Sequence, residues 1–420
     1  MRVLAAIVAP PHMSVSGAGR AAEQLSVALA EYCDMTIASM MGPQAGGAEE
    51  GRVRRLPVKA TLPPLLPWQR LSNRYRTLFY RSDIPQLIAK GGFDLVHIHN
   101  PMPALEMARI ARACRRAGIP YVVSTHGFNE IHNGARIYGF GPLKRLVWQE
   151  LVTRPVHQAV RHAAAVFTLS PADDEIVRQM GFAGDALVNV PNGVPVPRPA
   201  DPAGDVAAWQ RLGIGERRPG QLTCMFLANH TPNKGLPVLL SAFARLTCPF
   251  QLIVGGETRT EIDYGLASLL KGPDQRIVIT GRLSDEDVAA LYRRADLFVF
   301  PTLADTFPLA ILEAMSHGVP VLASAVGGIP HQVGKDYGRL VKPGQVEELA
   351  AALDDLAQDP DRLAEMGRLA RAHVAANYTW ESAARRAFTE YERLLRPAPA
   401  VRSPARPVAP TLRQQRGRPA

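Results

Sequence analysis

Cysteine is scarce in this chain, with four residues among 420, at Cys33, Cys114, Cys224 and Cys248. The four are scattered, and neither a C-x-x-C pair nor a histidine spacing typical of zinc occurs. This pattern argues against a disulfide scaffold and against a structural zinc site. It is typical of reduced thiols, so we expect a cytoplasmic protein.

Long apolar runs are also missing, and none approaches the roughly 18 residues that a transmembrane helix needs. The N-terminal run Val3–Ala9 is short, is stopped by Pro10 and Pro11, and lacks a convincing cleavage site for a signal peptide. We interpret it as a buried first strand.

Acidic residues are absent from the last 24 positions, although the chain as a whole has a net charge of +10. That segment supplies half of the charge through five arginines, at Arg402, Arg406, Arg413, Arg416 and Arg418. The mildly basic remainder suits an anionic small ligand or an anionic membrane as well as RNA, and no nucleic-acid-binding motif occurs. We expect no nucleic-acid partner, and we predict a disordered basic tail at 397–420.

Apolar strand-like runs alternate with amphipathic segments along most of the chain, which predicts parallel α/β sheets. The alternation occurs in two series, and Pro191–Pro202, with five prolines and Gly193, separates them. We therefore predict an α/β protein with two Rossmann-like, doubly wound domains that face a cleft. The predicted parts are an N-terminal domain at 1–195, a C-terminal domain at 196–378 and a C-terminal helix at 379–396.

Two long helical segments are also predicted from the pattern. Leu143–Ala164 is expected to form one long helix despite Pro155, and Pro360–Arg396 is expected to be helical with an interruption at Asn377–Trp380.

In the first half, polar or small residues follow predicted strands at positions where ligands bind in such folds. Gly17 opens a helix whose amides could face a diphosphate, although any doubly wound fold needs a glycine turn here. His126 directly follows the strand Tyr121–Thr125, which favours a role in the cleft over simple packing. His97 and His99 share one strand face, so at least one of them is expected to be structural.

In the second half, Lys234 stands at a helix entrance, where a cation is poorly matched to the helix dipole, so we expect an anion to neutralise it. Asp305 and Glu313 are eight residues apart, one in a loop and one in the helix that follows. One carboxylate could reach a sugar hydroxyl and the other a ribose, while a solvated acid is the alternative for Glu313. Asp285 and Asp287 resemble a D-x-D metal motif, but Ser284 with Asp287 fits a helix capping box, so no metal is expected.

Together these stretches resemble the family-four retaining glycosyltransferases of the GT-B fold, over roughly residues 1 to 396. The resemblance is strongest in "PTLADTFPLAILEAMSHGVPVLASAVGG" at Pro301–Gly328, and "DLVHIHNP", "STHGF", "VPNGV", "NKG" and "YTW" occur in the family's order. It implies roles for single residues: the Gly17 amide and Lys234 would bind the diphosphate, His126 and Asp305 the donor sugar, and Glu313 the ribose. The amides of Phe307 and Leu309 would assist at the phosphates.

Two positions depart from the family's pattern. Ala228 and Asn229 stand where the family usually has a Gly-Arg pair, so one guanidinium on the diphosphate is missing. Arg282 or Arg20 is a candidate to replace it. Asp305 replaces the commoner glutamate and is shorter by one methylene.

The resemblance implies a retaining, metal-independent hexosyltransferase that moves a sugar from a nucleotide-diphosphate donor to a glycan or lipid-linked acceptor, in cell-envelope or exopolysaccharide synthesis. The donor sugar is a substrate, and no cofactor is expected. Two alternatives stay open: a sugar-nucleotide-binding subunit with weak or no activity, and a non-hydrolysing sugar-nucleotide epimerase. Trp68–Arg81 and Arg136–Arg161 mix basic and aromatic residues, which suits peripheral contact with an anionic inner membrane face and equally suits an ordinary solvated surface.

Overall fold

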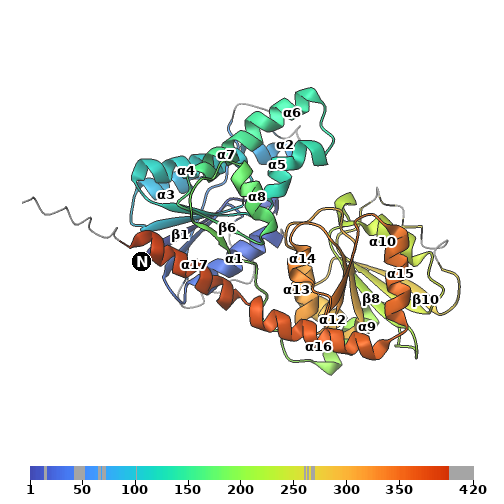
Figure 1. Ribbon diagram of the computed structural model, residues 1–420. Coiled ribbons are helices and arrows are strands. Elements are labelled where there is room, and N and C mark those ends of the chain that lie inside the picture. Colours follow the sequence, from blue (N-terminus) through green and yellow to red (C-terminus); the bar gives the residue numbers. More distant parts are fainter. Residues whose placement is uncertain are drawn as a thin grey trace, which may run out of the picture.

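The computed structural model describes residues 1–13, 17–41, 53–64, 68, 72–100, 102–259, 262, 264–265 and 270–396. The tail predicted at 397–420 lies outside these residues, as do residues 69–71 of the segment Trp68–Arg81. The described chain forms two α/β units, each a parallel sheet with helices packed against it (Figure 1).

The first unit is built on a seven-stranded parallel sheet in the order β3-β2-β1-β4-β5-β6-β7. The order reverses between β1 and β4, and ligands bind at such a switch point in open α/β sheets. The strands are β1 (Arg2–Ile7), β2 (Asp34–Ser39), β3 (Val53–Leu56), β4 (Leu95–His99), β5 (Tyr121–Ser124), β6 (Ala165–Thr168) and β7 (Leu187–Asn189). The helices are η1 (Pro11–Met13), α1 (Gly17–Leu29), α2 (Asn73–Arg76), η3 (Thr77–Phe79), α3 (Ile84–Ala89), α4 (Ala104–Ala117), α5 (Phe128–Ile137), α6 (Pro142–Trp148), η4 (Gln149–Thr153), α7 (Arg154–Arg161) and α8 (Ala172–Gln179).

The second unit has a six-stranded parallel sheet in the order β10-β9-β8-β11-β12-β13, which reverses between β8 and β11. Its strands are β8 (Leu222–Leu227), β9 (Phe250–Gly255), β10 (Gln275–Gly281), β11 (Leu297–Phe300), β12 (Val321–Ser324) and β13 (Gly338–Val341). Its helices are α9 (Pro202–Arg211), η5 (Pro232–Lys234), α10 (Leu236–Phe243), α12 (Asp285–Arg294), α13 (Leu309–Ser316), α14 (Ile329–Gln332), α15 (Val346–Ala357) and α16 (Pro360–Asn377). The predicted pair of Rossmann-like units is confirmed, because both sheets are parallel and doubly wound.

The chain passes between the two units twice, and the two passages touch. The Val194 amide donates a hydrogen bond to the Tyr378 carbonyl at 2.9 Å. A Cβ on Gly193 would lie 2.3 Å from the Trp380 nitrogen, so only glycine fits this close approach. The sequence boundaries at 195 and 378 remain predictions, and both lie beside this contact.

Helix α17 (Trp380–Leu395) returns to the first unit and packs along α1, as Figure 1 shows. It buries Ala383, Ala384, Ala387 and Tyr391 in the same core as β1. The predicted interruption is confirmed, because α16 ends at Asn377 and α17 begins at Trp380 with the Thr379 side chain as its cap.

The prediction of one long helix over Leu143–Ala164 is confirmed, because helical residues run without a break from Pro142 to Arg161. The five residues of η4 form a π-helical turn between α6 and α7. Pro155 lies just after this turn, inside the continuous helix, and its missing N–H removes one hydrogen bond there. The edge strand β3 was not predicted, because Arg54 and Arg55 interrupt its apolar pattern.

Candidate active site

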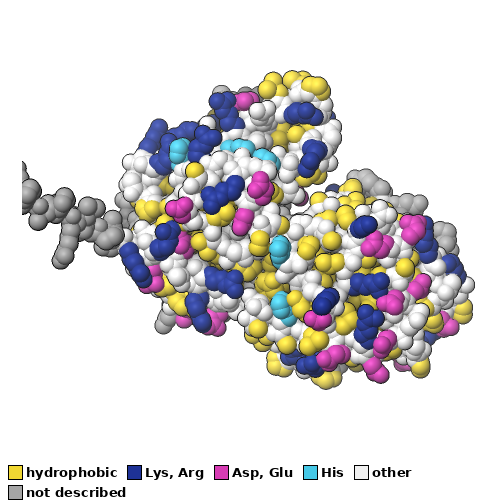
Figure 2. All heavy atoms as spheres, in the orientation of Figure 1, with side chains coloured by type: hydrophobic (Ala, Val, Ile, Leu, Met, Phe, Trp, Pro, Cys, Tyr) yellow, Lys and Arg dark blue, Asp and Glu magenta, His cyan; other side chains and the backbone are white. Residues whose placement is uncertain are grey.

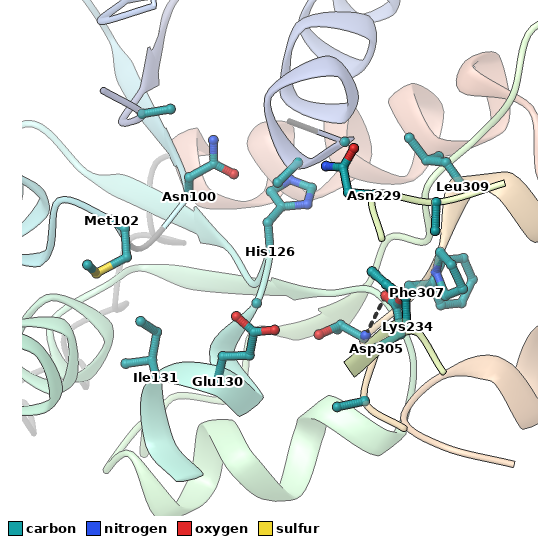
Figure 3. A pocket seen from close by; sticks show the side chains of 18 of the residues that line it. Asn100, Met102, His126, Glu130, Ile131, Asn229, Lys234, Asp305, Phe307 and Leu309 are labelled. Atoms are coloured by element: carbon teal, nitrogen blue, oxygen red, sulfur yellow. Dashed lines mark hydrogen bonds and ion pairs between the residues drawn. The ribbon is translucent and has the colours of Figure 1, made fainter. Parts of the chain in front are cut away.

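A cleft of about 1220 Å³ lies between the two units, at the ends of β4, β5, β8 and β11. Its lining includes most of the residues that the sequence singled out, namely Gly17, His126, Asn229, Lys234, Arg282, Asp305, Phe307 and Leu309. Figure 3 shows His126 and Glu130 on one side of this space, and Asn229, Lys234 and Asp305 on the other. Residues far apart in the sequence therefore share one cavity.

Lys234 and Asp305 form an ion pair in this cleft. The Lys234 Nζ donates to Asp305 Oδ2 at 2.5 Å, and it lies 5.8 Å from the centre of the Phe300 ring. The side chains are 26% and 14% exposed, so a ligand in the cleft can reach both. The expected anion beside Lys234 is thus a carboxylate of the chain itself, although the sequence analysis gave the two residues separate roles.

Gly235 fixes the position of Lys234. Its φ of +76° is a left-handed conformation, and a Cβ there would lie 1.9 Å from the carbonyl oxygen of Pro301. The turn η5 can therefore pack directly on the end of β11, whose following loop carries Asp305. The Asp305 Oδ1 also accepts from the Thr306 amide at 2.9 Å, which orients the carboxylate toward Lys234.

His126 ends the segment after β5, and Gly127, with a φ of +89°, turns the chain into α5. The His126 Nε2 is buried without a hydrogen-bond partner among the described residues. Burial lowers the pKa of His126 to about 4, so the ring is neutral at pH 7. A neutral imidazole with one unused nitrogen can exchange a hydrogen bond with a hydroxyl group of a ligand.

His97 and His99 lie behind His126 and do not line the cleft. His97 is hydrogen bonded to Ser124 at 2.7 Å and to the Tyr391 hydroxyl of α17 at 2.6 Å, so it is structural, as expected of at least one of the two. His99 is fully buried, and neither of its ring nitrogens has a partner among the described residues. Burial and the neighbouring histidines hold the pKa of His99 well below its ordinary value.

Two helix N-termini face the cleft. Helix α1 begins at Gly17 without an acid in its first turn, and α13 begins at Leu309 after Pro308. Free amides at such ends attract anions. Asn192, from the linker between the units, donates to the Phe307 carbonyl at 3.5 Å and ties the loop before α13 to the first unit.

The candidate cations beside the cleft have carboxylate partners. Arg282 lies 3.4 Å from Glu257, and Arg20 lies 3.4 Å from Asp285. Both arginines line the cleft and are about half exposed or more, so they can reorient toward an anion. Asn229 follows β8 and offers only an amide at the position of the missing arginine.

Of the two D-x-D-like acids, Asp285 lines the cleft and pairs with Arg20, whereas Asp287 is engaged outside it. The Ser284 hydroxyl accepts from the Asp287 amide at 3.1 Å, which confirms the capping box, and Asp287 pairs with Arg211. In the part of the chain that the structure describes, no group of three or more His, Cys, Asp or Glu side chains could hold a metal ion.

Glu313 lies in the second turn of α13 and is not among the cleft-lining residues. Burial raises the pKa of its carboxyl, while the nearby Arg20 opposes that shift. Glu313 is half-buried, and its role toward a ribose stays a prediction.

Sequence reasoning missed Glu130, which lies one helical turn after His126 in α5. Its carboxylate faces the Lys234–Asp305 pair across the cleft (Figure 3) and is 3.4 Å from the Tyr138 hydroxyl. Loss of hydration raises the pKa of Glu130; Lys234 opposes this shift and Asp305 adds to it. The spacing to His126 was the available signal, but no helix was expected at Phe128–Ile137.

Every helix among the described residues is too short or too polar to cross a lipid bilayer.

Comparison with known proteins identifies the family. Residues 16–193 match the model "Glycosyl transferase 4-like domain", and residues 221–359 match "Glycosyl transferases group 1". The D-inositol 3-phosphate glycosyltransferase of Nocardia farcinica is 30% identical over 73% of this chain and 67% of that protein. The MMP alpha-(1->4)-mannosyltransferase of Mycolicibacterium hassiacum is 29% identical over 73% of this chain and 72% of that protein.

A solved sucrose-phosphate synthase from Thermosynechococcus elongatus has the same fold, with a TM-score of 0.68 at 21% identity over 94% of this chain and 99% of that one. The two parallel sheets, the cleft between them and the family matches in both units all indicate the same family. The chain belongs to the group 1 glycosyltransferases of the GT-B fold.

Proposed function

We propose that this chain is a retaining, metal-independent hexosyltransferase that moves a sugar from a nucleoside-diphosphate donor to a glycan or lipid-linked acceptor of the cell envelope or an exopolysaccharide. The observation that carries the proposal is the Lys234–Asp305 pair. It lies in the same cleft as the N-termini of α1 and α13, with His126 on the opposite wall. The second unit thus offers positive charge and the amides at the start of α13, and the first unit offers the amides at the start of α1 and a neutral imidazole.

Breaking the anomeric bond builds negative charge on the leaving diphosphate and positive charge on the sugar. The Lys234 ammonium has three donors, so it can bind a phosphate oxygen while it keeps its contact with Asp305. The amides at Gly17 and Leu309 add fixed positive dipoles for the same charge. Asp305 is then free to accept hydrogen bonds from donor-sugar hydroxyls with its remaining lone pairs.

The acceptor approaches from the first unit, where His126 and Glu130 lie. We propose that Glu130 accepts a hydrogen bond from a hydroxyl of the acceptor other than the attacking one and so positions the acceptor, while the leaving phosphate takes the proton of the attacking hydroxyl. Retention then follows from attack on the same face that the diphosphate leaves, and no glycosyl-enzyme intermediate is needed.

Arg282 and Arg20 are our candidates for the charge that Asn229 does not supply. Each lines the cleft and pairs with one exposed or half-exposed carboxylate. A diphosphate with two negative charges competes well for a guanidinium held by a single solvated carboxylate, because such surface pairs are weak.

The test is a transfer assay with UDP-, GDP- and ADP-sugars in excess EDTA, with the anomeric configuration of the product read by NMR. We expect nucleoside diphosphate release with one donor, full activity in EDTA and a product with the donor's configuration. Complete, magnesium-reversible loss in EDTA would contradict metal independence, and an inverted product would contradict retention.

Asn229 favours one second candidate, a sugar-nucleotide-binding subunit with weak or no activity. That protein would bind a nucleotide sugar and release no diphosphate with any acceptor. Restoring the guanidinium with Asn229→Arg would then raise turnover from zero. If Arg282 already supplies this charge in an active wild type, the same substitution would change turnover little.

Contact with an anionic membrane face is the remaining part of the proposal. Its support is the basic surface of the first unit, including exposed Lys144 and Arg145 on α6. Liposome co-sedimentation should rise with anionic lipid and fall with salt. Equal, negligible binding to neutral and anionic vesicles at low salt would remove this part.

A further inference from the structure

Exposed apolar side chains are concentrated at one corner of the first unit. Among the described residues, five large ones lie between 137 and 147, namely Ile137, Tyr138, Leu143, Leu146 and Val147, and Leu143 is 75% exposed. Helix α6 has no buried residue at all. In Figure 2 this corner is the lobe at the top, where hydrophobic side chains gather around the position of α6 with Lys and Arg side chains among them.

One face of α6 forms part of the cleft wall. Leu143, Val147 and Trp148 line the cleft from α6, and Phe140 and Ile131 line it from the preceding loop and α5. Leu146 is on the same helix and 56% exposed, but it is not part of the lining. The apolar surface therefore has an inner part, which continues into the cleft, and an outer part, which does not.

The inner part is preformed. The Trp148 indole donates to the Ile131 carbonyl at 3.2 Å, and its ring lies 5.5 Å from the ring of Phe140 in an edge-on contact. A Cβ on Gly134 would lie 2.8 Å from the indole, so glycine lets α5 approach Trp148 closely. These contacts hold one side of the groove rigid before any ligand binds.

The side chains of α6 that line the cleft suit an apolar ligand. A bound sugar needs hydrogen-bond partners, yet α6 offers the cleft Leu143 and Val147, with Lys144 as its only charged group there. The groove is continuous with the space between His126 and Glu130, where the acceptor hydroxyl would lie. An occupant with an apolar chain on α6 and a hydroxyl at His126 satisfies both ends.

We propose that the groove formed by Ile131, Phe140, Leu143, Val147 and Trp148 binds the hydrocarbon portion of a lipid-linked acceptor. This inference rests on the proposed function for the side from which the acceptor approaches. Of the two acceptor classes named there, a glycan and a lipid-linked sugar, it selects the lipid-linked one. The apolar chain contributes affinity through burial, and the rigid groove places the sugar end at the donor.

The test measures binding of n-decyl β-D-glucoside, below its micelle concentration, and of methyl β-D-glucoside by calorimetry. The wild type should bind the decyl compound at least about tenfold more tightly, which burial of two methylene groups already supplies. Leu143→Ser and Val147→Ser should each remove most of this preference. Both side chains are exposed, so the melting temperature should stay unchanged.

Leu146→Ser is the matched control, on the same helix but outside the groove, and it should keep the preference within about twofold, as expected for a surface substitution. Equal affinity for the two glucosides, or a preference that survives Leu143→Ser, would overturn the inference. An equal loss in Leu146→Ser, together with vesicle binding, would also overturn it and indicate a membrane-contacting surface. Nucleotide-sugar binding is measured in a separate titration. Absence of that binding would contradict the proposed function without affecting the comparison of the two glucosides.

Discussion

The two walls of the cleft differ in how they are built. The wall from the second unit is polar and carries Lys234, Asp305, Arg282 and the N-terminus of α13. The wall from the first unit has His126 and Glu130 at its centre and is apolar toward α6. One wall suits a charged diphosphate and sugar hydroxyls, and the other suits a ligand that is polar at one end only.

The two walls also differ in how tightly they pack against the rest of the protein. Lys234 and Asp305 sit on turns pressed together at Gly235 and Pro301, with backbone against backbone. In contrast, α6 touches its surroundings mainly through Trp148, and its other side chains are exposed or half-exposed. A donor site needs fixed charges, whereas an acceptor groove can vary its surface without disturbing the core, so specificity toward the acceptor is expected to reside on α6.

The largest expected effect is on the polar wall. Lys234→Ala should lower kcat by about 10²–10³-fold, since it removes a charge contact that strengthens as the diphosphate leaves, worth on the order of 2.7–4 kcal/mol. Lys342→Ala, a lysine outside the cleft, is the control. A loss of less than tenfold would show that Lys234 does not stabilise the leaving diphosphate.

A pair of glycine variants compares the rigidity of the two walls. Gly235→Ala should lower the free energy of unfolding by more than about 3 kcal/mol, because the new Cβ meets the Pro301 carbonyl in addition to the strained φ. Gly139→Ala has a similar φ of +62° with no atom within 4 Å, so it should cost only about 1–2 kcal/mol. Urea unfolding measures both, and equal losses would mean that the polar wall is no more tightly packed.

Glu130→Gln should raise the KM for the acceptor by about tenfold, because a charge-assisted hydrogen bond becomes a neutral one. Donor hydrolysis without acceptor should not change. Glu150→Gln, an exposed acid of η4 outside the cleft, is the matched control. A fall in donor hydrolysis as large as the rise in KM would place Glu130 on the donor side instead.

The smallest expected effect concerns the histidines behind the apolar wall. The pKa of His97 is lowered to about 3 and that of His126 to about 4, and the pKa of His99 is well below its ordinary value. Below pH 6.5 the unfolded chain binds protons that the folded chain does not, so the free energy of unfolding falls as the pH falls toward the folded-state pKa values of these histidines.

His99→Leu should leave the melting temperature at pH 7 unchanged or slightly raised, because it removes two buried nitrogens without partners. The substitution should also make the fall in the free energy of unfolding between pH 6 and 4 less steep. The exposed His162→Leu serves as the control. A marked loss of stability at pH 7 would show that the His99 nitrogens make hydrogen bonds in solution.

The sequence predicted the polar wall better than the apolar one. Strand alternation indicated both sheets, and the residues after β8 and β11 were expected at the same edge of the second sheet, because the carboxyl ends of parallel strands in one sheet share one edge. The contact between Lys234 and Asp305 was not predictable, since 71 residues separate them and only the packing of Gly235 on Pro301 brings them together.

The apolar groove was missed for a local reason. The pattern from Leu143 onward fits an amphipathic helix whose apolar side packs inward, and periodicity does not tell a core-facing side from a ligand-facing one. Leu143 and Val147 of α6 line the cleft, whereas Val156 and Val160 of α7, after the π-helical turn of η4, are buried in the core. Glu130 was missed because Gly127 begins a helix that the pattern did not indicate.

Calorimetric titration of UDP-, GDP- and ADP-sugars in EDTA, against the wild type and Lys234→Ala, tests the central claim most directly. The account predicts saturable binding of one donor class by the wild type without metal, and binding by Lys234→Ala weaker by at least about tenfold, the scale of one lost charge-assisted contact. Absence of binding by any nucleotide sugar, or equal binding by the two proteins, would contradict the assignment of this cleft as the donor site.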